Sequence, residues 1–257
     1  PFSHAVNAGA YFEQVTGVPQ SSDGHYSYPD KCYKDGVLKK SCEGDDKYWV
    51  DGADYSTCVV ERAGSDKFTD ALAGSDNNNW LGIFDVEREN SDRVNEDTAC
   101  KPAVAITPLT SSKQDLVESI DDFQADGWTA GQIGTAWAWY MLSPKWNDIW
   151  PVESRAAEYG DSETTKIAIL MTDGDYNTAY ISGNGSSSSQ AKKLCKNMKD
   201  EGITVYTVGF MVSDAAKKLL KDCATTESHF YNATDGEKRK LADSSIAFKV
   251  AQLRLSK

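Results

Sequence analysis

From about residue 101 onward, the chain alternates short apolar runs with segments of helical periodicity. Four runs have the composition of buried strands, at residues 103–109, 165–172, 203–210 and 229–233. Apolar positions repeat at helical spacing in the segments that follow them, at residues 111–127, 129–144, 188–202, 213–224 and 244–256. Because strands that alternate with helices build a parallel sheet covered by helices, we expect residues 101–257 to form a doubly wound, mostly parallel α/β domain.

Local signals support several of these helices. Leu116, Ile120 and Phe123 fall on one face of the first predicted helix. Pro144 is expected to stop the second helix, and Ser213 is a plausible N-cap for the fourth. The aromatic run at residues 137–141 is expected to pack in the core, as aromatic residues on a helix between strands usually do.

Residues 1–100 do not follow this rhythm. They contain turn-forming stretches rich in Tyr, Asp, Gly and Asn, at residues 21–36, 42–58 and 73–80. Their many Tyr and Trp residues provide apolar surface for packing, which argues against plain disorder. We therefore expect an irregular, disulfide-stapled N-terminal insertion on the α/β domain.

Composition excludes some kinds of partner. The 257 residues carry a formal net charge of -12, and the basic residues are dispersed, so nucleic acid is not an expected partner. No apolar run approaches the roughly 18 residues that span a bilayer. We expect a soluble chain, with any membrane contact made through a segment outside it.

Cysteine number and spacing favour disulfides over a zinc site. No two cysteines form a C-x-x-C pair. The six cysteines of the chain are Cys32, Cys42, Cys58, Cys100, Cys195 and Cys223. Six cysteines allow about 15 connectivities. Nearness in the chain favours the pairs Cys32–Cys42, Cys58–Cys100 and Cys195–Cys223. Disulfides in turn indicate an oxidising compartment.

The segment KIAILMTDGDYNT, at residues 166–178, carries the most distinctive candidate chemistry. Asp173 follows a predicted buried strand, and ligands of open parallel sheets bind at such carboxyl ends. One interpretation is a calcium loop that begins at Asp173. Such a loop needs Gly at its sixth position and Glu at its twelfth, where this chain has Thr178 and Asn184, so we disfavour it.

A catalytic carboxylate pair, Asp173 with Asp175, is a second interpretation. Adjacent turn residues usually point apart, and the only histidines are His4, His25 and His229, none of which has a predicted place beside the pair. The sequence also lacks a G-x-S-x-G elbow and a glycine-rich phosphate loop.

A hard-cation site assembled from several strand ends is the third interpretation. The TDG turn, the preceding DGWTAGQIGTAW and the following GITVYTVGF resemble a von Willebrand factor A domain, a Rossmann-like α/β fold. Such domains hold Mg²⁺ or Ca²⁺ at a metal-ion-dependent adhesion site, built from a D-x-S-x-S motif, a loop Thr and the TDG Asp. The resemblance assigns the last two ligands to Thr129 and Asp173. The simpler roles are an N-cap for Thr129 and a turn-forming carboxylate for Asp173.

Longer stretches are similar to the A-type domains of the tight-adherence (TadG-like) pilus assembly group. They include PFSHAVNAG, CVVERAGSDKFTDA, GTAWAWYMLSP and the terminal IAFKVAQLRLSK, and so span nearly the whole chain. Proteins of this group face the periplasm and are tethered by an N-terminal helix. The resemblance therefore implies that residues 1–100 comprise the end of an early strand plus the insertion, and residues 101–257 the A-type core.

The D-x-S-x-S motif is a departure from the pattern. In the family it precedes the PFS segment, with which this chain begins, so the resemblance implies that the first strand, which is central in the sheet, is missing. Residues 54–58 have the pattern D-x-S-x-C, in which Asp54 and Ser56 would be the ligands. They do not follow a buried strand, and a turn is the simpler interpretation.

These observations lead us to expect a non-enzymatic protein of the bacterial cell envelope, periplasmic or extracellular, that acts in adhesion or pilus assembly. A cation at Thr129 and Asp173 would accept a carboxylate from a protein partner. The alternatives are a structural scaffold with a vestigial metal site, and a metal-assisted hydrolase that uses Asp173 and Asp175.

Overall fold

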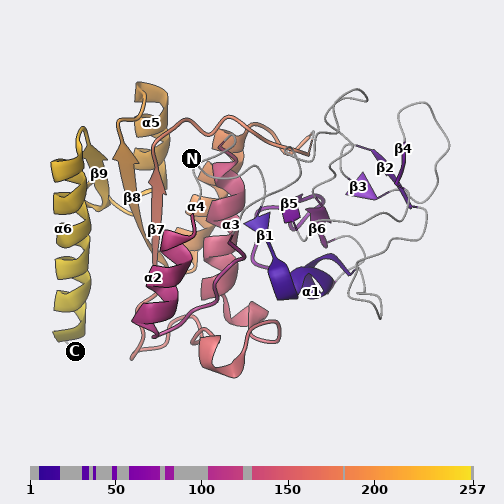
Figure 1. Ribbon diagram of the computed structural model, residues 1–257, viewed down its shortest axis with the longest axis horizontal. Helices are drawn as coiled ribbons and strands as arrows, with labels where there is room; N and C mark the ends of the chain where they lie inside the picture. Colours follow the sequence, from indigo (N-terminus) through magenta and orange to yellow (C-terminus); the bar gives the residue numbers. More distant parts are fainter. Residues whose placement is uncertain are drawn as a thin grey trace.

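The computed structural model describes residues 6–17, 31–34, 37–38, 48–50, 58–75, 79–83, 104–123, 129–181 and 183–255. Three parallel strands form the main sheet, in the order β7-β8-β9. They span Ile167–Thr172, Thr204–Phe210 and Phe230–Ala233. These are three of the four predicted strands, and each begins within two residues of its expected start. Because they are parallel, all three carboxyl ends lie at the same edge of the sheet (Figure 1).

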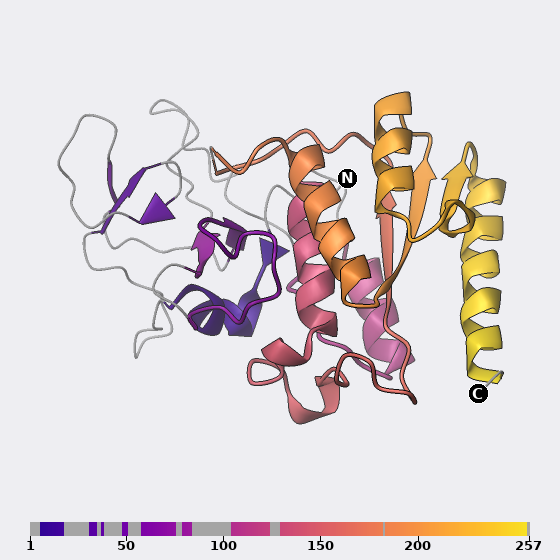
Figure 2. The same ribbon diagram turned by 180° about the vertical axis from the view of Figure 1, so that it is seen from behind.

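Four helices flank this sheet: α3 (Gly131–Leu142), α4 (Ser187–Asp200), α5 (Asp214–Cys223) and α6 (Gly236–Leu255). Side chains alternate between the two faces of each strand. Ala168, Leu170 and Val205 face the core shared with α3, α4 and α5. Tyr206 and Val208 face the opposite side, where α6 covers them. Figures 1 and 2 show α6 at the outer end of the sheet, beside β9. Helices therefore lie on both faces of the sheet, as the sequence predicts, and α6 covers β8 and β9 on its side.

The described parts of residues 1–100 contain short antiparallel strands, which the sequence did not predict. β1 (Val6–Asn7), β5 (Cys58–Arg62) and β6 (Leu81–Ile83) form one sheet. β2 (Lys31–Lys34), β3 (Val37–Leu38) and β4 (Tyr48–Val50) form another. A short helix, α1 (Phe12–Thr16), follows β1 and a 3₁₀ turn at Gly9–Tyr11. The buried side chains of α1 and β5 join the same apolar core as α3 and α4, and the partly buried Val6 of β1 packs against it.

Two predictions near α2 are wrong or incomplete. Residues 104–109, the described part of the predicted strand 103–109, form no strand, and Pro108 has no N–H to give to a ladder. Instead, the Thr107 hydroxyl lies 3.0 Å from that of Ser119 in α2 (Lys113–Asp121). Leu116 and Ile120 lie in α2 and are exposed, whereas Phe123 follows the end of the helix, so the predicted helical face is shorter than expected.

The ends of the other helices follow local capping. Ser213 caps α5 as predicted, since its side chain accepts a hydrogen bond from the Ala216 N–H. α3 ends at Leu142, and a 3₁₀ turn (Pro144–Trp146) begins at the predicted stop. α6 begins eight residues before the predicted start at residue 244. Its first turn is held by Asp235, whose side chain accepts from the Lys238 N–H at 2.8 Å, a capping signal that we overlooked.

The disulfide between Cys195 and Cys223 joins α4 to α5, as predicted. Cys58 is also disulfide-bonded. The remaining predicted pairs, Cys32–Cys42 and Cys58–Cys100, each include residues that lie outside the described side chains, so they stay predictions. The helices of the described residues include none that is long and apolar enough to cross a membrane.

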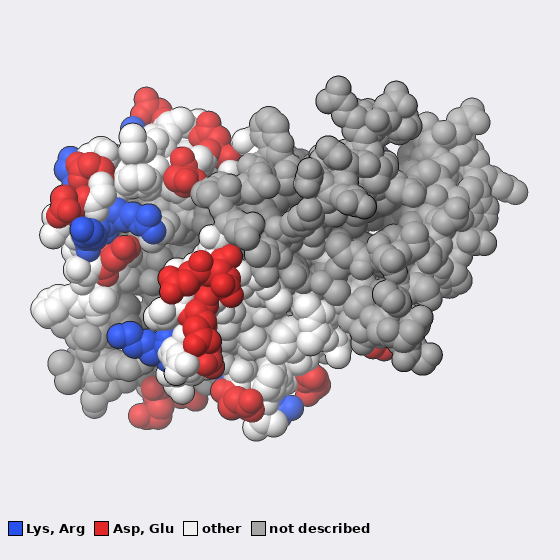
Figure 3. Space-filling view, in the orientation of Figure 1, with Lys and Arg blue, Asp and Glu red and all other residues white. Residues whose placement is uncertain are grey.

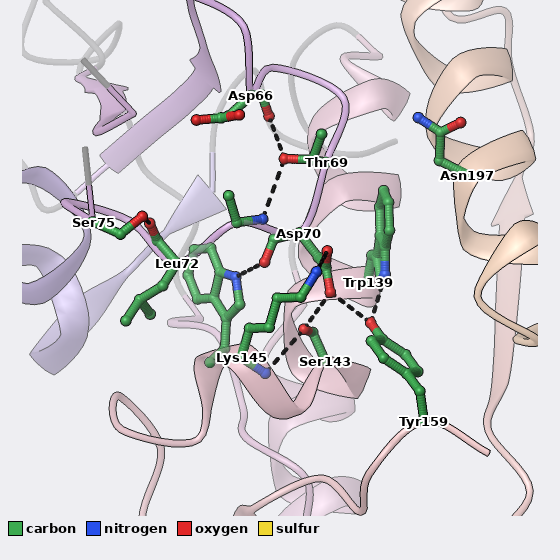
Figure 4. Close-up of polar contacts among 12 residues, drawn as sticks. Asp66, Thr69, Asp70, Leu72, Ser75, Trp139, Ser143, Lys145, Tyr159 and Asn197 are labelled. Atoms are coloured by element: carbon green, nitrogen blue, oxygen red, sulfur yellow. Dashed lines mark hydrogen bonds and ion pairs between the residues drawn. The ribbon is translucent and has the colours of Figure 1, made fainter. Parts of the chain in front are cut away.

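A buried carboxylate ties the N-terminal region to the α/β core (Figure 4). The Asp70 side chain accepts hydrogen bonds from Ser143 Oγ at 2.6 Å, from Lys145 Nζ at 2.7 Å and from Tyr159 Oη at 2.7 Å. Trp146 Nε1 donates to the Asp70 carbonyl. Burial by itself would raise the pKa of Asp70, but these donors and the charge of Lys145 hold that pKa below its ordinary value. The carboxylate is therefore charged and fully engaged at neutral pH.

Replacing Asp70 with Asn should lower the free energy of unfolding by about 2 to 4 kcal/mol at pH 7, because the buried donors lose a charged acceptor. Since the folded-state pKa is lowered, the stabilisation is complete above the unfolded-state value of about 4 and is lost as the pH falls through the folded-state value. Urea unfolding at a series of pH values measures both effects. Asp66→Asn is a suitable control, because Asp66 joins this network through its main-chain carbonyl. Equal stability of Asp70→Asn and wild type at pH 7 would contradict the prediction.

Removing the α4–α5 disulfide should also destabilise the fold. The bond closes a loop of 28 residues, for which the chain-entropy estimate is about 3 to 4 kcal/mol. The variant that combines Cys195→Ala with Cys223→Ala tests this by urea unfolding against wild type, with wild type in reductant as a second comparison. A loss below about 1 kcal/mol would show that helix packing alone fixes the two helices.

Candidate metal-binding corner

The turn after β7 is built by Thr172. Its buried hydroxyl accepts from the Gly174 N–H at 3.2 Å and lies 3.0 Å from the Gly174 carbonyl oxygen. This short ring of hydrogen bonds closes the turn as soon as the strand ends. It leaves Asp173 exposed at the carboxyl edge of the sheet, where ligands of open α/β sheets bind.

The loop that precedes α3 is fastened to this turn. The Thr129 carbonyl accepts from the N–H groups of Asn177 at 3.0 Å and Thr178 at 3.2 Å. In return, the Thr129 N–H donates to Asn177 Oδ1 at 3.1 Å. A Cβ atom built on Gly174 would lie only 3.5 Å from the Thr129 hydroxyl oxygen. The structure therefore brings Thr129 to the turn that carries Asp173, as the sequence prediction requires.

The alternative role of Thr129 as an N-cap is wrong. The N-cap residue of α3 is Ala130, and no side chain caps this helix end. The Thr129 side chain is largely buried but lies beside Gly174 instead of over the first turn of the helix. Its hydroxyl oxygen is therefore available for a different contact at the corner.

Close packing of Tyr176 on the start of α3 explains the glycine at position 131. A Cβ atom at Gly131 would lie 2.2 Å from the Tyr176 ring, so only glycine allows the contact. Burial raises the pKa of Tyr176 to about 12, against a smaller lowering effect from Thr135. The Ser188 hydroxyl donates to the Tyr176 carbonyl and joins the same loop to α4.

Asp175 contacts the start of α5. Its Oδ1 accepts from the Ser213 hydroxyl at 2.5 Å, and Ser213 is the N-cap of α5. The loop carboxylate thus connects the turn after β7 to the start of α5. Asn177 is similarly engaged with Thr129. These contacts leave neither the calcium-loop ligand set nor a convergent carboxylate pair at this corner.

Hydrogen bonds to β5 hold the later part of the loop that follows β7. The sequence analysis did not predict this contact. Buried Glu61 accepts through Oε1 from the N–H groups of Tyr180 at 2.7 Å and Ile181 at 3.1 Å. Asn184 Nδ2 donates to the Arg62 carbonyl at 2.9 Å. The available signal was the charged pair at the end of CVVER, an otherwise apolar strand, since buried charges are rare unless they are engaged.

Met211 is an unusual residue at the same edge. It follows the carboxyl end of β8, has a left-handed φ of 54°, and leaves 69% of its surface exposed. Its N–H donates to the Ala233 carbonyl, which holds the strained backbone against β9. A positive φ at a residue other than glycine costs stability, and such strained positions cluster at functional sites.

The oxygen donors of the corner suit a hard cation such as Mg²⁺ or Ca²⁺. Thr129 and Asp173 supply two side-chain oxygens, and the searched part of the chain has no group of three or more His, Cys, Asp or Glu residues that would complete a metal site. Asp54 and Ser56 lie outside the described residues. Water and other groups would therefore have to fill most positions of a cation that takes about six ligands.

The hydrogen bonds between Thr129 and Asn177, which we call the clasp, join the loop before α3 to the loop after β7. Their contribution can be tested without a cation. Asn177→Ala removes the acceptor of the Thr129 N–H and should speed hydrogen exchange of that amide by roughly fivefold to tenfold, the equivalent of about 1 kcal/mol. Asn177→Asp keeps an acceptor oxygen and should preserve the protection. Amide exchange followed by NMR makes the measurement. Equal exchange rates in wild type and Asn177→Ala would show that the clasp contributes nothing.

With this geometry in view, comparison with known proteins identifies the family. The family model of the von Willebrand factor type A domain matches residues 84–244. A search of curated proteins finds no match. The match concerns the family as a whole and does not single out the tight-adherence group. Because it covers more than half of the 257 residues, the chain belongs to the von Willebrand factor type A domain family.

Proposed function

We propose that this protein is a non-enzymatic module that binds a protein partner through a divalent cation at the corner of Thr129 and Asp173. Domains of this family generally mediate protein–protein interactions and adhesion, often with a metal ion. The observation that carries the proposal is the clasp of Asn177 on Thr129, which brings the two candidate ligands from separate loops to one turn. In the proposed mechanism, the cation accepts a carboxylate from the partner.

Further ligands can approach the corner along the side of β7 that faces away from β8. β7 pairs with β8 on one side, and no described strand pairs with its other side. Its side chains are mostly apolar, which is typical of a parallel strand covered on both faces, yet Ile169 leaves 49% of its surface exposed. A further parallel strand at this edge would end beside Asp173 and could deliver the hydroxyl and carboxylate oxygens that the corner lacks.

A role in the bacterial cell envelope, in adhesion or pilus assembly, is the finer part of the proposal. The resemblance to the tight-adherence group supports it, and so does the Cys195–Cys223 disulfide, because such bonds persist in oxidising compartments. We place the protein in the periplasm or outside the cell on these grounds.

A structural scaffold with a vestigial metal site is the second candidate. It is favoured by the small number of charged ligands that the described residues bring to the corner. The hydrolase alternative receives less support, because Asp175 bonds to Ser213 instead of converging on Asp173.

Cation titration separates these candidates. If the proposal holds, Mg²⁺ or Ca²⁺ at about 100 times its dissociation constant stabilises the protein by about 2.7 kcal/mol. Asp173→Ala should abolish that shift, because it removes the charged ligand. Asp214→Ala is the matched control, since Asp214 is another exposed aspartate after the carboxyl end of a strand. Calorimetric titration and thermal unfolding give the measurement. Wild-type protein whose melting temperature does not respond to either cation would instead favour the scaffold.

A further inference from the structure

The exposed Met211 lies beside the candidate corner. Thr172, the last residue of β7, pairs with Gly209 in β8, and adjacent strands of a sheet lie about 5 Å apart. Asp173 follows Thr172 directly, and Met211 follows Gly209 by two residues. Asp173 and Met211 therefore leave the same edge of the sheet on neighbouring strands, one residue out of step.

The main chain around Met211 is held on both sides. The Met211 N–H donates to the Ala233 carbonyl at 2.9 Å. Val212 is buried in a small apolar cluster with residues of α5, and the Ser213 hydroxyl donates to Asp175 of the corner loop. These contacts fix the backbone and bond the loop after β8 to the loop after β7, while 69% of the Met211 surface stays exposed.

Methionine is not the residue that this backbone conformation favours. The φ of 54° at Met211 is the only positive φ at a non-glycine residue in the described part of the chain. Glycine would adopt it without steric cost, whereas a residue with a Cβ atom is strained there. Because most of the side chain is exposed, packing inside the molecule does not account for it either. An exposed apolar side chain in a strained conformation beside a candidate site points to contact with a ligand.

The surroundings of the corner are acidic. Asp173, Asp175 and Asp214 are exposed after the ends of β7 and β8. In Figure 3, the region around α5, at the upper left, shows acidic side chains set among uncharged ones. One carboxylate of a partner can approach because the proposed cation attracts it, whereas a second acidic group beside it would be repelled.

We propose that the partner of the Thr129–Asp173 corner presents a carboxylate flanked by a bulky aliphatic residue, and that Met211 binds the aliphatic side chain. This inference rests on the proposed cation-bridged function and deepens it. The unbranched thioether side chain of methionine adapts to apolar groups of different shape, which suits a contact residue. Contact over about half of a leucine side chain should tighten binding roughly fivefold.

Three pentapeptides with blocked ends test this contact in saturating Mg²⁺ or Ca²⁺: Gly-Leu-Asp-Leu-Gly, Gly-Gly-Asp-Gly-Gly and Gly-Lys-Asp-Lys-Gly. The chain has four methionines, so NMR of protein labelled at the methionine methyl groups follows Met211 directly. The leucine peptide should bind roughly fivefold more tightly than the glycine peptide and shift the Met211 methyl resonance. The lysine peptide measures how far attraction to the acidic surroundings alone selects a partner.

Substitutions at position 211 separate the side chain from the backbone. Met211→Gly removes the side chain and the strain together, so it should abolish the preference for the leucine peptide and leave the cation-dependent rise in melting temperature unchanged. Met211→Leu keeps an aliphatic side chain of similar size and should retain the preference. Val152→Ala is the control, because Val152 is 73% exposed beyond the end of α3 that lies away from the corner. It should leave all three affinities unchanged, and thermal unfolding verifies that each variant folds.

The outcomes distinguish this inference from the function on which it rests. Equal affinity of wild type for the leucine and glycine peptides, or a preference that survives Met211→Gly, would overturn the role of Met211 and leave the cation-bridged function intact. A lysine peptide that binds more tightly than the leucine peptide would also overturn it, since charge alone would then select the partner. If no peptide binds, or if binding persists in EDTA and in Asp173→Ala, the cation-bridged function fails and this inference fails with it.

Discussion

The reciprocal hydrogen bonding between Thr129 and Asn177 is the contact on which the organisation of the carboxyl edge depends. It joins a loop before α3 to a loop after β7, two segments that are 48 residues apart in the sequence. Because both the N–H and the carbonyl of Thr129 are engaged, the backbone at this position has little freedom. The Thr129 hydroxyl is then held beside Gly174, and the exposed Asp173 stands at the same turn.

Contacts from β5 and α5 hold the loop that follows β7. Glu61 of β5 receives the N–H groups of Tyr180 and Ile181, while Asp175 receives the Ser213 hydroxyl at the start of α5. The N-terminal region is thus more than an appendage, since one of its strands forms the support on which the loop rests. Asp70 fastens a neighbouring part of the same region to the segment after α3. A change in this region would reach the candidate site through main-chain hydrogen bonds.

Two surfaces of the protein remain more apolar than the fold itself requires. One is the face of β7 around Ile169, and the other is the apolar side of α2, with Leu116, Val117 and Ile120. Parallel strands are normally covered on both faces, and amphipathic helices normally bury their apolar side. Both surfaces are therefore places where additional polypeptide can pack with a gain in free energy.

The sequence by itself determined the α/β alternation, because periodicity is a local property of side chains: β7, β8 and β9 follow from their apolar runs, and α4 and α5 from their helical spacing. It also predicted the Cys195–Cys223 disulfide and the position of Asp173 at the end of a strand. It could not determine the short strands of residues 1–100 or the absence of the predicted strand at residues 104–109, because strands depend on partners far away in the chain. Only the tertiary structure decided that Asn177 holds Thr129, that Asp175 turns to Ser213, and that Glu61 supports the loop. Each of these is a hydrogen bond between distant segments, and its geometry exists only once the chain has folded.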